Sequence, residues 1–134
     1  MTSLVTYLGD LRTEAKHLAS GTTIYTDAPV DNQGKGEMFS PTDLVATALA
    51  NCALTIMGIA ARTHQINIEG STCEVLKTMG TDPRRIVKID VTFHMKGQEF
   101  DDKQRAILSN AAKTCPVFYS LHEDMEKNIV INWA

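Results

Sequence analysis

The feature that most constrains this chain is an uncharged run of 18 residues, 44–61, with the sequence LVATALANCALTIMGIAA. A helix of about 20 apolar residues can cross a membrane, so this run approaches the necessary length. It is nevertheless rich in Ala and Thr, has Asn51 near its middle, and is alone of its kind in an otherwise polar chain. A helix that is apolar on all sides is normally a core helix. The sequence therefore favours a buried helix of a soluble protein over a membrane span.

The residues just before this run are typical of a helix start. Ser40 can cap the helix, Pro41 suits the first helical position, and Asp43 places a negative charge near the positive end of the helix dipole. The loop that precedes them, residues 29–40, contains two glycines among polar residues. We expect a helix that ends near Thr63.

Strands are predicted on both sides of this helix. Residues 3–27 divide into three short strands, with turns at Gly9-Asp10 and Ser20-Gly21. The middle one, LRTEAKHL, also contains helix-forming residues, but turn residues enclose it within eight positions, which is short for a helix. Residues 66–78 and 85–96 are two longer strands joined by a turn, which predicts a hairpin.

The C-terminal part is predicted to be mainly helical. Residues 101–114 have an acidic first turn and helical spacing of apolar residues. Cys115-Pro116 interrupts this helix, a second helix is expected over 117–125, and KNIVINW forms the last strand. The order β-β-β-α-β-β-α-α-β predicts one α+β domain over 1–134 with antiparallel sheet.

Composition excludes several classes of protein. The chain has 134 residues, with 13 Lys and Arg against 16 Asp and Glu, so a nucleic-acid role based on a basic surface is disfavoured. Its three cysteines are too few for a disulfide scaffold, and the N-terminus MTSLVTYLGD does not have the pattern of a signal peptide. We expect a cytoplasmic protein with reduced thiols.

Two cysteines are candidates for chemistry. Cys115 precedes Pro116 at a helix start, where free N–H groups favour a thiolate and lower the pKa. Cys52 lies in mid-helix and would need a cationic neighbour, for which the chain offers Arg12, Arg62, Arg84, Arg85 and Arg105. Each cysteine also suits the role of a small buried hydrophobe. Cys73, within a strand, is expected to be structural.

The surroundings of these two cysteines resemble a known family. SPTDLVATALANC ends at Cys52, CPVFYSL begins at Cys115, and YLGDL occupies residues 7–11. With the glycine-bearing loop before Ser40 and the element order, these motifs resemble the osmotically inducible protein C and organic hydroperoxide resistance (OsmC/Ohr) family. The resemblance implies antiparallel sheets wrapped around two central helices in an intertwined homodimer, with active sites at the subunit interface.

The resemblance also implies a thiol peroxidase that reduces organic hydroperoxides. Cys52 matches the peroxidatic cysteine, which becomes a sulfenic acid, and Cys115 matches the resolving cysteine, which forms a disulfide with it. A dithiol such as dihydrolipoamide or a lipoylated protein then restores the thiols. No metal, organic cofactor, nucleic acid or membrane is involved, and no histidine has metal-ligand spacing.

An arginine and a carboxylate complete the site that the family implies. Arg12 is the only arginine in the N-terminal strands and is expected to hold the thiolate. Peroxidase branches of the family place a glutamate directly after the helix-opening proline, but Thr42 occupies that position here. Asp43 would point about 100° away, and Glu37 lies just upstream, so the carboxylate is Glu37, Asp43 or neither.

Further expectations concern the walls of the site and the alternative functions. Apolar walls that would favour bulky peroxides are expected from Phe39, Leu49, Met57, Phe118 and Tyr119. Because Thr42 replaces the expected glutamate, a non-catalytic protein that binds an apolar small molecule, or a thiol redox sensor, remains the alternative. A purely structural module is a third interpretation.

Overall fold

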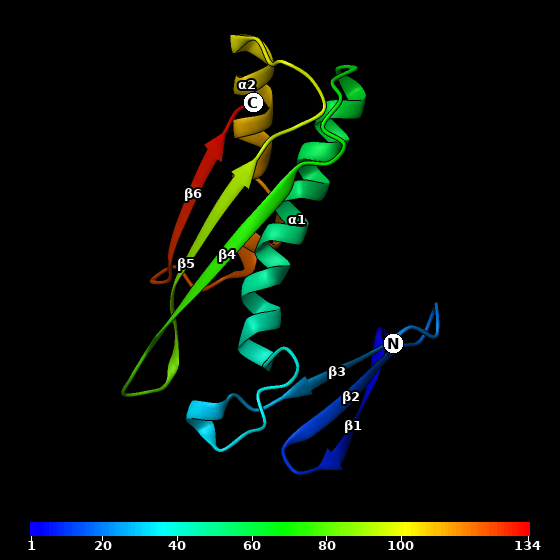
Figure 1. Ribbon diagram of the computed structural model, residues 1–134, viewed down its shortest axis with the longest axis vertical. Helices are drawn as coiled ribbons and strands as arrows, with labels where there is room; N and C mark the ends of the chain where they lie inside the picture. The colour runs from blue at the N-terminus through cyan, green and yellow to red at the C-terminus, as the bar shows by residue number, and fades with distance from the viewer. The chain divides into compact units, whose positions relative to one another are not determined.

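The computed structural model describes residues 1–134, which divide into two compact units, Met1–Val45 and Ala46–Ala134. The order of elements along the chain is the predicted one, with an additional 3₁₀ turn, η1 (Figure 1). The bounds are β1 Ser3–Gly9, β2 Arg12–His17, β3 Thr23–Asp27, η1 Val30–Asn32, α1 Pro41–Thr63, β4 Thr72–Gly80, β5 Arg85–His94, α2 Asp102–Ala112, α3 Pro116–Ser120 and β6 Glu126–Asn132.

The N-terminal unit is built on a three-stranded antiparallel sheet in the order β1-β2-β3. Val5, Ala15 and Ile24 are directly opposite one another in its register, so they share one face of the sheet. Arg12 alternates to the other face. No hydrophobic side chain of this unit is buried. Because a small sheet is stable only when its hydrophobic face is covered, the unit needs a partner surface.

The start of α1 confirms the predicted capping signals. Ser40 Oγ accepts the backbone N–H of Asp43 at 3.1 Å, and an Asp43 carboxylate oxygen accepts the backbone N–H of Ser40 at 2.9 Å. These two hydrogen bonds form a capping box, which satisfies donors that a helix start leaves unpaired. Pro41 occupies the first helical position, and the helix ends at Thr63 as expected.

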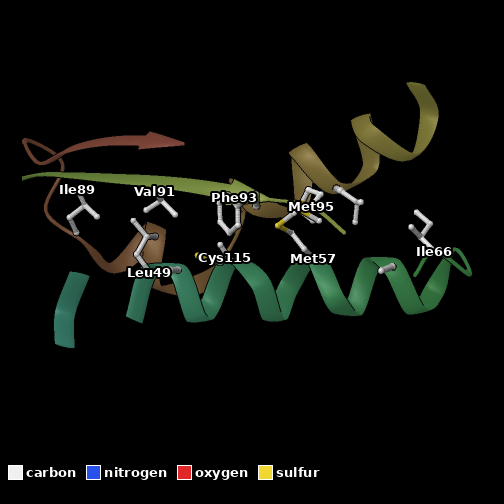
Figure 2. Close-up of a cluster of buried hydrophobic side chains, with 14 of the residues drawn as sticks. Leu49, Met57, Ile66, Ile89, Val91, Phe93, Met95 and Cys115 are labelled. Carbon is white, nitrogen blue, oxygen red and sulfur yellow. The ribbon is translucent and has the colours of Figure 1, made fainter. Parts of the chain in front are cut away.

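The C-terminal unit holds the hydrophobic core. Side chains at helical spacing on α1, including Leu49, Ala53 and Met57, are fully buried. They pack with alternate residues of β5, including Val91 and Phe93, and Figure 2 shows this layer between α1 and β5. The opposite side of α1 is less covered, since Ile59 is 58% exposed. One helix face therefore forms the core and the other is open in the single chain.

The helix α1 is long and apolar enough to cross a membrane by length and composition. One such helix is also what a soluble protein with a core helix contains, and α1 packs on a sheet through its buried stripe. The contacts of this buried stripe with the sheet are those of a core helix.

The second sheet corrects one prediction. Strands β4 and β5 form the expected antiparallel hairpin, but β6 lies parallel to β5, in the order β4-β5-β6. The expectation of purely antiparallel sheet was therefore wrong for this strand. The helices α2 and α3 lie between β5 and β6 in the chain and provide the crossover that a parallel pair requires.

Two predicted elements are shorter in the structure. The strand expected over 66–78 begins only at Thr72, because Gly70 has a positive φ of 84° and a turn joins Ile68 to Ser71. The helix expected over 117–125 ends at Ser120, since Leu121 is extended and His122 begins a turn. In contrast, the ambiguous segment LRTEAKHL is a strand, as predicted.

Candidate functional site

The first cluster is a pair of thiols in the C-terminal unit. Cys115 is the N-cap of α3 and is fully buried, whereas Cys52 is partly exposed on α1. The two side chains, distant in the sequence, belong to the same hydrophobic cluster, and the Cys52 side chain contributes to the raised pKa of Cys115. Both are free cysteines. The folding of one unit thus brings together the two cysteines that the sequence singled out.

The electrostatics of Cys115 differ from the expectation. Its sulfur accepts the backbone N–H of Phe118 at 3.3 Å, as the helix start predicts. The pKa of Cys115 is nevertheless raised, chiefly because burial disfavours the charged thiolate. The neighbouring Cys52 side chain raises it further, and the Phe118 N–H lowers it by less. The predicted lowering of the Cys115 pKa was wrong, because a five-residue helix start does not offset the loss of water.

The third cysteine has the environment of a structural residue. Cys73 lies opposite Phe93 in the hairpin of β4 and β5, and it packs against the hydrophobic core. Burial and the charge of Glu74 raise its pKa to about 11. At neutral pH this thiol is almost entirely protonated, which makes it a poor nucleophile.

The second cluster lies in the N-terminal unit and is centred on Arg12. The guanidinium donates from Nε to Asp27 Oδ1 at 2.7 Å and from Nη2 to Asp27 Oδ2 at 2.8 Å. A further hydrogen bond runs from Nη2 to Glu37 Oε2 at 2.8 Å. Asp27 is 1% exposed and Glu37 64% exposed. Arg12 therefore has one buried and one exposed carboxylate partner.

These contacts shift the ionisation of the groups involved. The hydrogen bonds from Arg12 lower the pKa of Asp27 despite its burial, and those to Asp27 and Glu37 raise the pKa of Arg12. Both groups of the buried pair are therefore charged at neutral pH. Such a two-pronged pair fixes the plane of the guanidinium as well as its position.

A tight loop carries Glu37 to this cluster. Gly34 N–H donates to the Pro29 carbonyl at 2.9 Å, and a side chain at Gly34 would place its Cβ 1.7 Å from the Ala28 carbonyl oxygen. Only glycine allows the loop to close so tightly. The backbone N–H of Glu37 then donates to Asp27 Oδ2 at 3.2 Å. Asp27 thus holds both the arginine and the loop.

The structure distinguishes the carboxylates that the sequence left open. Glu37 contacts Arg12 directly, and Asp43 belongs to the capping box of α1. Thr42, at the position where the family's peroxidase branches have glutamate, has its hydroxyl 3.2 Å from Ser40 Oγ. The catalytic roles assigned to these residues stay predictions.

Sequence reasoning missed Asp27. The available signal was the hairpin of β2 and β3, in which Arg12 and Asp27 are directly opposite each other. Opposite residues of an antiparallel pair point to the same face, so the register alone would have paired them. The segment TTIYTDA has the pattern of a strand, and only a count outward from the turn pairs Asp27 with Arg12.

The other arginines proposed as partners of Cys52, and the residues proposed as apolar walls, lie in different parts of the structure. Arg85 donates to the carbonyls of Thr81 and Pro83, and Arg105 lies 5.7 Å from the Trp133 ring. Leu49 and Met57 are fully buried core residues. Among the remaining expected walls, Tyr119 is exposed and Phe118 packs against the core beside Cys115.

Phe39 lines an open depression in the N-terminal unit. The depression has a volume of about 530 Å³, and Glu37 lies on its wall together with Tyr25 and Met38. It therefore combines apolar and aromatic surface with one of the Arg12 partners. No group of three His, Cys, Asp or Glu side chains is arranged to hold a metal ion.

Comparisons with known proteins agree on one family. The family model described as OsmC-like protein matches residues 34–129. A solved structure from Psychrobacter arcticus 273-4, provisionally described as an osmotic stress induced and detoxification response protein, is 55% identical, with a TM-score of 0.95 over 98% of this chain and 96% of that one. No curated protein matches the chain.

More distant structures share the fold. An organic hydroperoxide resistance protein OsmC from Legionella pneumophila is 15% identical, with a TM-score of 0.76 over 98% of this chain and 97% of that one. An OsmC-like protein of unknown function from Vibrio cholerae is 14% identical, with a TM-score of 0.80 over 97% of each chain. At such identities the likeness establishes the α+β fold.

Proposed function

The chain belongs to the OsmC-like protein family, and from this premise we propose that it is a thiol peroxidase that reduces organic hydroperoxides to alcohols. The observation that carries the proposal is that Cys52 and Cys115, 63 positions apart, pack in one hydrophobic cluster, where the Cys52 side chain helps to raise the pKa of Cys115. Cys52 is the more exposed of the two, so it is the one that a substrate can reach. Cys115 is fully buried, and we assign it the role of the resolving cysteine.

In the first step, the Cys52 thiolate attacks the terminal oxygen of the hydroperoxide. The S–O bond forms as the O–O bond breaks, the sulfur is oxidised to a sulfenic acid, and the alkoxide leaves. The alkoxide takes a proton and departs as the alcohol. A guanidinium that donates hydrogen bonds to both the sulfur and the leaving oxygen would stabilise the developing charge, and we assign this role to Arg12.

In the second step, the Cys115 sulfur attacks the sulfenic sulfur of Cys52. A disulfide forms and water leaves, so the protein ends two electrons more oxidised and the peroxide two electrons reduced. A dithiol co-substrate, of which dihydrolipoamide or a lipoylated protein is an example, returns both thiols by exchange and becomes a disulfide itself. Such a cycle requires a reducing compartment, which supports a cytoplasmic location.

We further propose that the working form is a homodimer. The sheet of the N-terminal unit leaves Val5, Tyr7 and Ile24 exposed on one face, and α1 exposes Val45 and Ile59. Exposed apolar surface on this scale is typical of an interface. A second copy of the chain supplies apolar surface of the same kind, and it would cover the faces that the single chain leaves open.

The homodimer predicts a measurable mass. Sedimentation equilibrium should give about twice the chain mass of 14.7 kDa, and Val5→Glu should shift the protein toward monomer because it places a charge on the apolar face. Glu14→Gln, on the opposite face of the same sheet, serves as the matched control and should leave the mass unchanged. A wild-type protein that sediments as a monomer at micromolar concentration contradicts the dimer.

The peroxidase is tested by following thiols. Reduced protein is mixed with cumene hydroperoxide or with hydrogen peroxide, and the titratable thiols are counted over time. We expect fast loss of two thiols per chain with the organic peroxide and slower loss with hydrogen peroxide, because apolar walls bind the alkyl group. If micromolar organic peroxide leaves both thiols intact, the protein is not a peroxidase and the non-catalytic alternative is favoured. Equal slow oxidation by both peroxides favours the redox sensor.

A further inference from the structure

The Arg12 cluster contains more negative than positive charge at its centre. One guanidinium faces two carboxylates, Asp27 and Glu37. A further cation, Lys35, acts on Asp27 through space and lies 3.8 Å from Asp10. Arg12 therefore cannot assist a thiolate simply as an excess positive charge. It must act through the direction of its hydrogen bonds, so whatever fixes that direction matters for the reaction.

Three of the five N–H groups of Arg12 have carboxylate partners. The Nε–H and one Nη2–H bind the two oxygens of Asp27, and the second Nη2–H binds Glu37. The two bonds to Asp27 use one edge of the planar group, and the bond to Glu37 runs from the neighbouring edge, which Nη2 shares with Nη1. The two N–H groups on Nη1 remain, and they lie in the plane that Asp27 fixes.

The two carboxylates differ in how firmly they can hold the guanidinium. Asp27 is almost fully buried, binds through both oxygens, and is itself anchored by the backbone N–H of Glu37 and by the bond from its own N–H to the Phe39 carbonyl. Glu37 is largely exposed and binds through one oxygen. Exposed ion pairs contribute little because water competes with them, whereas a buried two-pronged pair holds its geometry.

We propose that Asp27 is the positioning residue of Arg12: it holds the edge formed by Nε and Nη2, so that the plane of the guanidinium is fixed and the two N–H groups on Nη1 stay available to a further partner. The proposal rests on the peroxidase function for its catalytic part. In the family that the chain resembles, the glutamate after the helix-opening proline orients the arginine. Thr42 occupies that position here, and the proposal assigns the orienting role to Asp27, a residue of a strand. Glu37 is then an auxiliary partner.

The kinetic test compares three substitutions in the rate of Cys52 oxidation by cumene hydroperoxide. A misplacement of about 1 Å costs about a hundredfold in rate, so Asp27→Asn should lower the rate at least about tenfold. Glu37→Gln should lower it less, and Glu14→Gln, an acidic residue on the same strand face, should leave it unchanged. In an Arg12→Lys background, Asp27→Asn should add no further loss, because Asp27 acts through Arg12. An additive loss in that background overturns the proposal and indicates a general structural effect.

A second measurement does not depend on activity. In ¹⁵N-labelled protein, the Arg12 Nε–H signal, assigned by its absence in Arg12→Lys, should be resolved in the wild type and in Glu37→Gln but lost in Asp27→Asn. The backbone amide spectrum of each variant shows whether it is folded. Persistence of the signal in folded Asp27→Asn, or its loss in Glu37→Gln, overturns the positioning role. If the wild type does not react with peroxide, the proposed function fails, and this signal still decides whether Asp27 holds Arg12.

Discussion

Replacing Cys52 by serine is expected to lower the rate of organic hydroperoxide reduction by at least about a thousandfold, as the loss of an enzyme's nucleophile does. A serine hydroxyl is almost fully protonated at neutral pH and does not form the sulfenic acid on which the cycle depends. The measurement is peroxide consumption with excess dithiol as reductant. This loss of rate follows from the low reactivity of the serine hydroxyl and does not require the substitution to change the fold.

The other two cysteines provide matched controls for this experiment. In the absence of added dithiol, Cys115→Ser should consume one equivalent of peroxide per chain, with the sulfenic acid on Cys52 trapped by dimedone and found by mass spectrometry. Cys73→Ser should cycle at the wild-type rate, because the high pKa of Cys73 keeps that thiol protonated. Full cycling by Cys52→Ser, or its loss in Cys73→Ser alone, would show that the reactive sulfur has been misassigned.

The fold was predictable where local signals and periodicity agree. The capping box at Ser40 and Asp43, followed by an apolar run, determined the start of α1 within one residue. The parallel pairing of β6 was not predictable in this way. The sequence shows that KNIVINW is a strand but carries no sign of its direction, which is set by the crossover through α2 and α3.

The site residues stay predictions, and the structure differs from the sequence-based expectation in their environments. The motifs around Cys52 and Cys115 point to two residues that pack in one hydrophobic cluster. The pKa of Cys115 was expected to fall, because a helix start can be recognised in sequence, whereas the burial of a side chain depends on what packs over it. The contact of Asp27 with Arg12 was not predicted for a related reason. It depends on the pairing of β3 with β2, and the residues next to Asp27 in the sequence do not indicate it.

The raised pKa of Cys115 has a kinetic consequence. To attack the sulfenic acid, Cys115 must be a thiolate, and burial keeps it protonated at neutral pH. Below the pKa of a thiol, the thiolate fraction rises tenfold for each pH unit. A pKa above the ordinary value of about 8.5 therefore predicts that disulfide formation accelerates about tenfold per unit between pH 6 and pH 8, without a plateau. A lowered pKa would instead give a rate that levels off within this range.

This profile is measured in a single turnover. Reduced protein receives one equivalent of cumene hydroperoxide, samples are quenched in acid, and the disulfide is counted as the loss of two hydrogens by mass spectrometry. The first step is timed in parallel in Cys115→Ser, so that only pH values at which sulfenic acid forms faster than the disulfide are used. A profile that is flat across pH 6 to 8 contradicts the raised pKa and would mean that the Cys115 thiolate is already formed at neutral pH. A tenfold rise per unit indicates instead that the Cys115 thiol is still protonated throughout this range, so that its ionisation controls the second step, as its raised pKa predicts.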